Sequence, residues 1–190
     1  MPEEKEVKTE DVDKVYEELI ARSNEFYDSG EYEKALGFCD DAAKLKYNQG
    51  LAWYMKGMNY IKIGKYNEAL AAFDAAMRAD FELSEPLIGK GYVYLKLFRF
   101  EDAIKVLKDA FAKAMEVQVA CLIGLCYTFI ENEDEAVSWF RRAFEKDKEY
   151  TLKFFDEIYT ELVIKDENIT ADEKIAVKTA IDKLKKKLST

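Results

Sequence analysis

The stretch GLAWYMKGMNYIKIGKYNEALAAFDAAMRADFEL, residues 50–83, decides the fold. Trp53, Gly57 and Tyr60 follow one another at intervals of four and three residues, so they share one face of a helix. Ala69 and Phe73 continue the same spacing in the second half of the stretch. Small residues suit positions where two helix backbones come close, and aromatic residues fill the remaining space. We therefore predict two short helices that pack against each other as a hairpin.

The same pattern recurs along most of the chain. Repeats that begin at Tyr16, Gly50, Ser84 and Val117 are spaced by 34, 34 and 33 residues. Five positions of the repeat keep their character throughout. Position 8 is small (Ser23, Gly57, Gly91, Gly124), position 11 is aromatic (Phe26, Tyr60, Tyr94, Tyr127), positions 20 and 27 are alanine (Ala35, Ala69, Ala103, Ala136; Ala42, Ala76, Ala110, Ala143), and position 24 is apolar (Cys39, Phe73, Leu107, Phe140). Breaks between paired helices are expected at Gly30, Gly64, Phe98–Arg99 and Glu131–Asn132.

This ladder of small and aromatic positions resembles the tetratricopeptide repeat, a 34-residue helix–turn–helix unit. The resemblance covers residues 16–150 and departs from the family at position 7, where Arg22, Lys56 and Lys90 replace a large apolar residue. It implies an all-α, right-handed α-solenoid of four repeats, at residues 16–49, 50–83, 84–116 and 117–150, within a domain of residues 11–150. Residues 1–10 are acidic and are expected to be flexible.

The period is lost after Tyr150, and residues 151–190 are predicted to form two further helices. The first is expected at residues 151–165, and a capping-box pattern that begins at Thr170 opens the second. Repeat arrays need atypical terminal helices to cover the apolar face of the last repeat. We therefore predict that these two helices cap the solenoid.

Composition narrows the class of function. A net charge of −9 argues against nucleic-acid binding and against binding to anionic membrane surfaces. The charged beginning of the sequence lacks a signal-peptide core, no apolar run is long enough to span a membrane, and three cysteines are an odd number. These features predict a soluble cytoplasmic protein.

Catalytic and metal-binding motifs are missing from the sequence. The chain has no histidine, which excludes histidine-based triads and metal sites, and three cysteines cannot supply a four-thiolate site. Its glycines form neither a Walker loop nor a dinucleotide-binding motif. We predict a non-catalytic protein without metal or cofactor. The alternative is a different class of function, in which clustered carboxylates act in catalysis or bind a ligand. Carboxylates that converge in a deep pocket would support this alternative.

The resemblance implies a concave groove lined by the first helix of each repeat. Its lining positions are mostly aliphatic or aromatic here. The predicted groove residues are Ile20, Asn24, Tyr27, Leu51, Tyr54, Met58, Ile61, Lys62, Ile88, Tyr92, Leu95, Lys96, Cys121, Leu125 and Phe129. The Lys, Asn and Arg clamp with which some family members hold acidic chaperone tails is essentially missing, since only Asn24 matches it.

The predicted function is a protein–protein interaction scaffold that binds an apolar peptide or an amphipathic helix of a partner in this groove. Self-association is the alternative, with the same groove or a solenoid end pairing two copies. A third possibility is that these residues form core, or that the chain's own C-terminal helix fills the groove.

Overall fold

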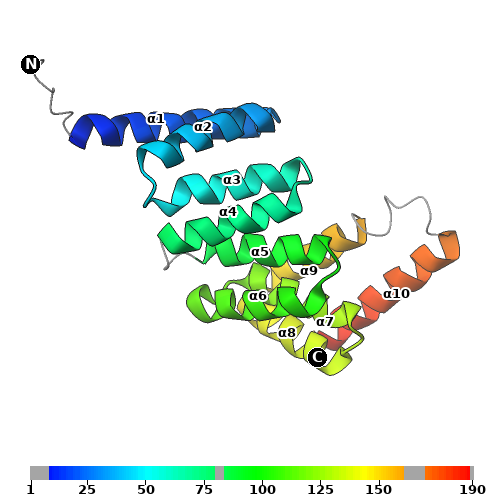
Figure 1. The fold of residues 1–190 in the computed structure, drawn as a ribbon. Helices are drawn as coiled ribbons and strands as arrows, with labels where there is room; N and C mark the ends of the chain where they lie inside the picture. The colour runs from blue at the N-terminus through cyan, green and yellow to red at the C-terminus, as the bar shows by residue number, and fades with distance from the viewer. Residues whose placement is uncertain (1–8, 80–83, 161–169, 189–190) are drawn as a thin grey trace, which may run out of the picture. The chain divides into compact units, whose positions relative to one another are not determined.

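A computed structural model describes residues 9–79, 84–160 and 170–188. Within these ranges the chain forms ten α-helices and no strand (Figure 1). The all-α fold class predicted from the sequence is therefore confirmed. The chain divides into two compact units, Met1–Leu97 and Phe98–Thr190, here called unit one and unit two. The division falls between the two helices of the third predicted repeat, and the four-repeat division remains a prediction.

Unit one is a succession of helices that pack on their neighbours. It contains α1 (Thr9–Asp28), α2 (Tyr32–Leu45), α3 (Gly50–Lys62), α4 (Tyr66–Ala79) and α5 (Glu85–Lys96). Short turns pair α1 with α2 and α3 with α4, while α2 packs on α3 and α4 packs on α5 (Figure 1). The first helices of successive pairs also touch, α1 with α3 and α3 with α5.

The core of unit one follows the repeat positions. Phe73 is fully buried, and a Cβ added at Gly57 or at Gly89 would lie 2.5 Å from its ring. The ring therefore fits only because both neighbouring helices carry glycine there. The alanines at positions 20 and 27 are likewise buried, between 0% and 5% exposed in all four repeats.

Lysine at position 7 is explained by ion pairs between successive repeats. Lys56 Nζ lies 2.6 Å from Asp40, and Lys90 Nζ lies the same distance from Asp74, the equivalent aspartate of the next repeat. Both lysine side chains are less than 20% exposed, and Lys56 also lies over the rings of Trp53 and Tyr60. Their stems cover apolar surface while their charges stay paired.

All four breaks have a left-handed backbone at the same repeat position, position 15. The φ angles are 80° at Gly30, 76° at Gly64, 56° at Phe98 and 59° at Glu131. Glycine adopts this conformation without strain, whereas a residue with a Cβ is strained there. The turn geometry is thus kept at all four breaks, including the two without glycine.

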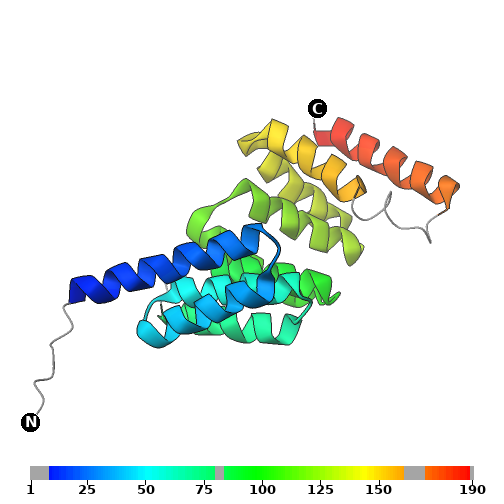
Figure 2. The ribbon, with the colours of Figure 1, turned by 90° about the horizontal axis from the view of Figure 1, so that it is seen from above.

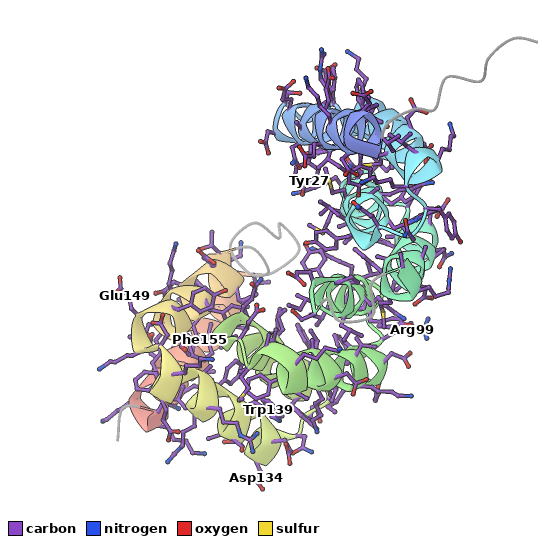
Figure 3. All side chains as sticks on the ribbon, turned by 90° about the vertical axis from the view of Figure 1, so that its left-hand side faces the viewer. Tyr27, Arg99, Asp134, Trp139, Glu149 and Phe155 are labelled. Atoms are coloured by element: carbon purple, nitrogen blue, oxygen red, sulfur yellow. The ribbon has the colours of Figure 1, made fainter. Side chains whose placement is uncertain are left out.

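Unit two contains α6 (Phe100–Ala114), α7 (Val117–Phe129), α8 (Glu133–Lys146), α9 (Lys148–Tyr159) and α10 (Ala171–Leu188). Helix α7 packs on α6 and α8, α9 packs on α7 and α8, and α10 lies beside α8 and α9 (Figure 2). Its core includes Phe140, whose ring centre lies 4.7 Å from that of Phe155 on α9, and Trp139, whose ring meets Phe111 of α6 edge-on. Figure 3 labels Trp139 and Phe155.

Several predicted boundaries shift. Helix α1 begins at Thr9, inside the N-terminal segment predicted to be flexible, and residues 1–8 lie outside the described residues. Helix α9 begins at Lys148 rather than at residue 151, because the side chain of Asp147 accepts a hydrogen bond from the Tyr150 backbone N–H at 2.9 Å and caps the helix there. It ends at Tyr159, and residues 161–165 of the predicted helix lie outside the described residues. None of the described helices is long and apolar enough to cross a bilayer.

Candidate functional site

Most of the predicted groove residues lie on the first helices of unit one. We call these twelve residues the α1–α3–α5 face. Seven are half-buried (Ile20, Tyr27, Tyr54, Met58, Ile61, Ile88, Leu95) and five are exposed (Asn24, Leu51, Lys62, Tyr92, Lys96). Leu51 is 45% exposed and Tyr92 is 39% exposed, so both apolar side chains are accessible on this face.

Part of this face is core. Tyr54, Met58 and Ile61 pack against the buried cluster around Phe73, and the Tyr54 ring lies 6.0 Å from the Phe73 ring. Ile20 packs against a second cluster that contains Tyr16 and Ala52. One side of these side chains therefore belongs to the core, as the alternative interpretation of the groove residues expects. Their other side remains accessible.

A hollow of about 190 Å³ opens between α1 and α3. Its walls contain four predicted residues, Asn24, Tyr27, Tyr54 and Met58, together with Met55 and Asn59. Tyr27 lies on the side of α1 turned toward α3 (Figure 3). Sequence analysis missed Met55 and Asn59 because they occupy repeat positions 6 and 10, outside the lining positions that the family implies. The sequence feature that could have pointed to them is the polar Asn59, which lies four residues after Met55 and therefore on the same buried side of α3.

Aromatic rings and two lysines shape the electrostatics of the hollow and its surroundings. The pKa of the Tyr54 hydroxyl is raised by burial first and then by the negative charge of Glu85 and by Tyr27. Lys62 Nζ lies 5.6 Å from the centre of the Tyr27 ring, and Lys96 Nζ lies 5.3 Å from that of Tyr92. These cation–π contacts hold both lysine ammonium groups against aromatic faces.

Asn59 lines the hollow and is 1% exposed. Its Nδ2 donates to the Met55 carbonyl at 2.9 Å and lies 3.9 Å from the Cys39 sulfur. Cys39 in turn lies 3.0 Å from the Ser23 hydroxyl, which donates to the Ala35 carbonyl. Asn59 Oδ1 is buried and accepts no hydrogen bond from the described residues.

The groove residues predicted in unit two do not form one open surface. Cys121 is fully buried beside Thr151 of α9, and burial raises the pKa of its thiol to about 12. Leu125 is half-buried, while Phe129 is 45% exposed and stacks on Phe100 with 4.7 Å between ring centres. Cys121 therefore departs from its predicted place on a binding surface, because α9 packs on α7 at this point.

Unit two has a larger hollow of its own, of about 500 Å³, between the α7–α8 turn region and α10. It is lined by Thr128, Ala136, Val137, Ala180 and Leu184, with charged side chains from Glu131, Glu133, Lys183 and Lys187. Helix α10 is held nearby by ion pairs of Lys185 with Asp156 and of Lys187 with Glu133. Within the described residues, no group of three or more cysteine, aspartate or glutamate side chains is placed to hold a metal ion.

Comparison with known families agrees with the repeat pattern. The tetratricopeptide repeat model matches residues 50–82 and again residues 117–150. The chain therefore contains tetratricopeptide repeats in these two stretches. The first match is the stretch that decides the fold, and the second is the fourth predicted repeat. No curated protein matches the chain significantly.

Solved tetratricopeptide repeat structures share its fold. A MamA protein from Desulfovibrio magneticus, residue 41 to its end, is 21% identical with a TM-score of 0.68, and the alignment covers 93% of this chain and 98% of that one. YrrB, described as having an unusual peptide-binding site, is 24% identical with a TM-score of 0.63, covering 87% and 84%. The second repeat domain of human RPAP3, solved with the HSP70 peptide SGPTIEEVD, is 20% identical with a TM-score of 0.57, covering 60% and 97%. These similarities confirm a solenoid of helix–turn–helix repeats.

Proposed function

We propose that this tetratricopeptide repeat protein is a non-catalytic interaction module that binds a peptide segment of a partner protein on the α1–α3–α5 face. The observation that carries the proposal is the hollow between α1 and α3, which has tyrosine and methionine walls and is continued by partly exposed apolar side chains on α3 and α5. Methionine adapts its shape to varied apolar ligands, and aromatic residues dominate the binding energy of protein interfaces.

The known structures support the proposal and limit it. YrrB and the RPAP3 domain are described as peptide-binding, and RPAP3 holds a peptide with two consecutive glutamates. Here the clamp for an acidic chain end is essentially missing, and Lys62 and Lys96 lie over tyrosine rings. The proposed ligand is therefore an apolar segment, which those two lysines orient only at the edge of the face.

The test requires variants that remove binding without removing core. Tyr54 is unsuitable because its ring packs against Phe73. Leu51 and Tyr92 are better targets, since both are well exposed on α3 and α5. Tyr47, which is 68% exposed in the turn before α3, provides an aromatic control outside the face. Its backbone carbonyl, and not its side chain, accepts the Trp53 indole hydrogen bond, while its ring meets the Trp53 ring edge-on at 5.6 Å between centres.

Partner segments would be identified by cross-linking and mass spectrometry, synthesised, and titrated against the full chain by fluorescence anisotropy. We expect the Leu51→Ser/Tyr92→Ser variant to bind at least about tenfold more weakly, since a central anchor contributes more than about 1 kcal/mol. Tyr47→Ser should bind like the wild type, and circular dichroism should show unchanged helicity in all three proteins. Equal binding by the double variant would refute the proposal.

Self-association is tested with the same samples. Light scattering over a hundredfold range of concentration should show a single mass for the chain without peptide. A mass that rises with concentration and falls back in the Leu51→Ser/Tyr92→Ser variant would instead assign the α1–α3–α5 face to pairing of two copies.

A further inference from the structure

The hollow between α1 and α3 contains one polar atom whose hydrogen bonding is incomplete. Asn59 is 1% exposed, lies at the wall of the hollow, and its Oδ1 accepts no hydrogen bond from the described residues. Buried polar atoms in folded proteins nearly always have a partner, and each exception calls for an explanation such as a missing ligand. Asn59 thus adds to the walls of the hollow a buried acceptor that needs a donor.

The orientation of the Asn59 amide is fixed by its surroundings. One end of the amide lies 2.9 Å from the Met55 carbonyl oxygen, which can only accept a hydrogen bond. That end must therefore be the Nδ2 donor, and the alternative flipped amide would place two acceptors against each other. The free atom is an acceptor, so the group that completes it must be a donor.

The other walls define the rest of the ligand. Tyr27, Tyr54, Met55 and Met58 present aromatic rings and thioethers, Asn24 adds an amide, and the side chains that line the hollow carry no formal charge. Thioether groups make favourable contacts with aromatic rings. A volume of about 190 Å³ exceeds by far the space that a single water needs, about 10–15 Å³. The complementary group is therefore a flat, neutral ring that carries a hydrogen-bond donor for Asn59 Oδ1.

We propose that the hollow between α1 and α3 takes the indole ring of a tryptophan in the bound peptide, with the indole N–H donating to Asn59 Oδ1. Tryptophan is the side chain that combines a large ring with a donor and no acceptor. Because Oδ1 is itself buried, binding in this way requires the flexible, unbranched side chains of Met55 and Met58 in the walls to move and admit the ring. This inference rests on the proposed peptide-binding function and specifies the residue that anchors the ligand.

Two probes of the same shape test the donor directly. Indole and benzofuran differ in one position, where benzofuran has an oxygen in place of the N–H group. Each would be titrated into the full chain labelled with ¹³C at the methionine methyl groups. We expect indole to shift the Met55 and Met58 signals with a dissociation constant about fivefold lower than that of benzofuran, the effect of one neutral hydrogen bond. Met115, 59% exposed in unit two, should not respond and provides the internal control.

A substitution then assigns the preference to Asn59. Asn59→Leu keeps the approximate size of the side chain and removes the acceptor, so indole and benzofuran should bind this variant equally. Equal binding of the two probes to the wild type would overturn the inference without the need for any variant. A preference that persists in Asn59→Leu, or signals that move at Met115 instead, would overturn it as well.

The outcomes separate this inference from the proposed function. If the probes bind equally while peptide binding still depends on Leu51 and Tyr92, the indole subsite is wrong and the peptide-binding face stands. If the probes show the expected preference but peptide binding is unaffected by the Leu51→Ser/Tyr92→Ser change, the hollow binds indole and the proposed function is wrong.

Discussion

Alanine at Gly57 should destabilise the protein, although alanine normally stabilises a helix relative to glycine. A Cβ at Gly57 would lie 2.5, 2.7 and 2.8 Å from three atoms of the Phe73 ring. The ring is fully buried and cannot retreat, because a Cβ at Gly89 on the other neighbouring helix would also lie 2.5 Å from it. Forcing a methyl group into such a core costs about 1–3 kcal/mol of unfolding free energy.

Gly37 provides the matched control. It lies inside α2, and a Cβ there would meet nothing within 4 Å. Gly37→Ala should therefore raise the unfolding free energy by about 0.5–1 kcal/mol, the normal helix preference for alanine. Since both variants gain that preference, the difference between them is the steric cost alone. Gly57→Ala should be less stable than Gly37→Ala by about 1–3 kcal/mol.

The assay is urea unfolding followed by the fluorescence of Trp53 on α3, in a Trp139→Phe background so that unit one alone is observed. A Phe73→Leu substitution supplies a second check, because a smaller side chain should shrink the penalty of Gly57→Ala. Equal stabilisation by Gly37→Ala and Gly57→Ala would show that the Phe73 ring has room to move, and would refute the packing argument.

Two further predictions concern unit two. Glu131→Gly should raise the unfolding free energy of unit two by about 0.5–1 kcal/mol. Glycine removes the backbone strain at a φ of 59°, and its greater backbone entropy in the unfolded state cancels part of that gain. A lower melting temperature in the variant would contradict this prediction. The hydrogen bond from Lys185, at 2.7 Å, lowers the pKa of the Asp156 carboxyl in the folded protein. The stability that this hydrogen bond provides is therefore fully present above the unfolded pKa of about 4, and it is lost as the pH falls through the folded pKa. The Asp156 side chain is 57% exposed, so Asp156→Asn should lower stability by at most about 1 kcal/mol at pH 7. The difference from the wild type should vanish in melts at acid pH, where the carboxyl is protonated, and a difference constant with pH would exclude the ion pairs of Asp156 as its cause.

The repeat pattern predicted the helices and their packing because it encodes local geometry. Gly57 and Phe73 are 16 residues apart, and their sizes are matched because the two helices of one repeat must touch there. The same reasoning located the turn at Glu131, although its residue type gives no hint of a left-handed backbone. It failed at the start of α9, where the Asp147 cap lengthened the helix by three residues.

The binding residues were predicted less completely, because a linear pattern does not say what covers a helix face. Cys121 occupies the same repeat position as Tyr54, yet α9 buries Cys121 while Tyr54 borders an open hollow. The role of Asn59 could not be recognised from the sequence either. The Met55 carbonyl accepts from its Nδ2, and only the packing of the helices shows that its Oδ1 is buried without a hydrogen bond.

The sequence by itself thus determined the all-α fold, the repeat length, the small and aromatic positions that let the helices pack, and the positions of the turns, because each of these depends on residues within about one repeat. Only the tertiary structure decided which apolar side chains became core, which one α9 covered, and where a buried amide was left with a free acceptor. Those outcomes depend on contacts between different helices, which the residues of a single repeat do not specify.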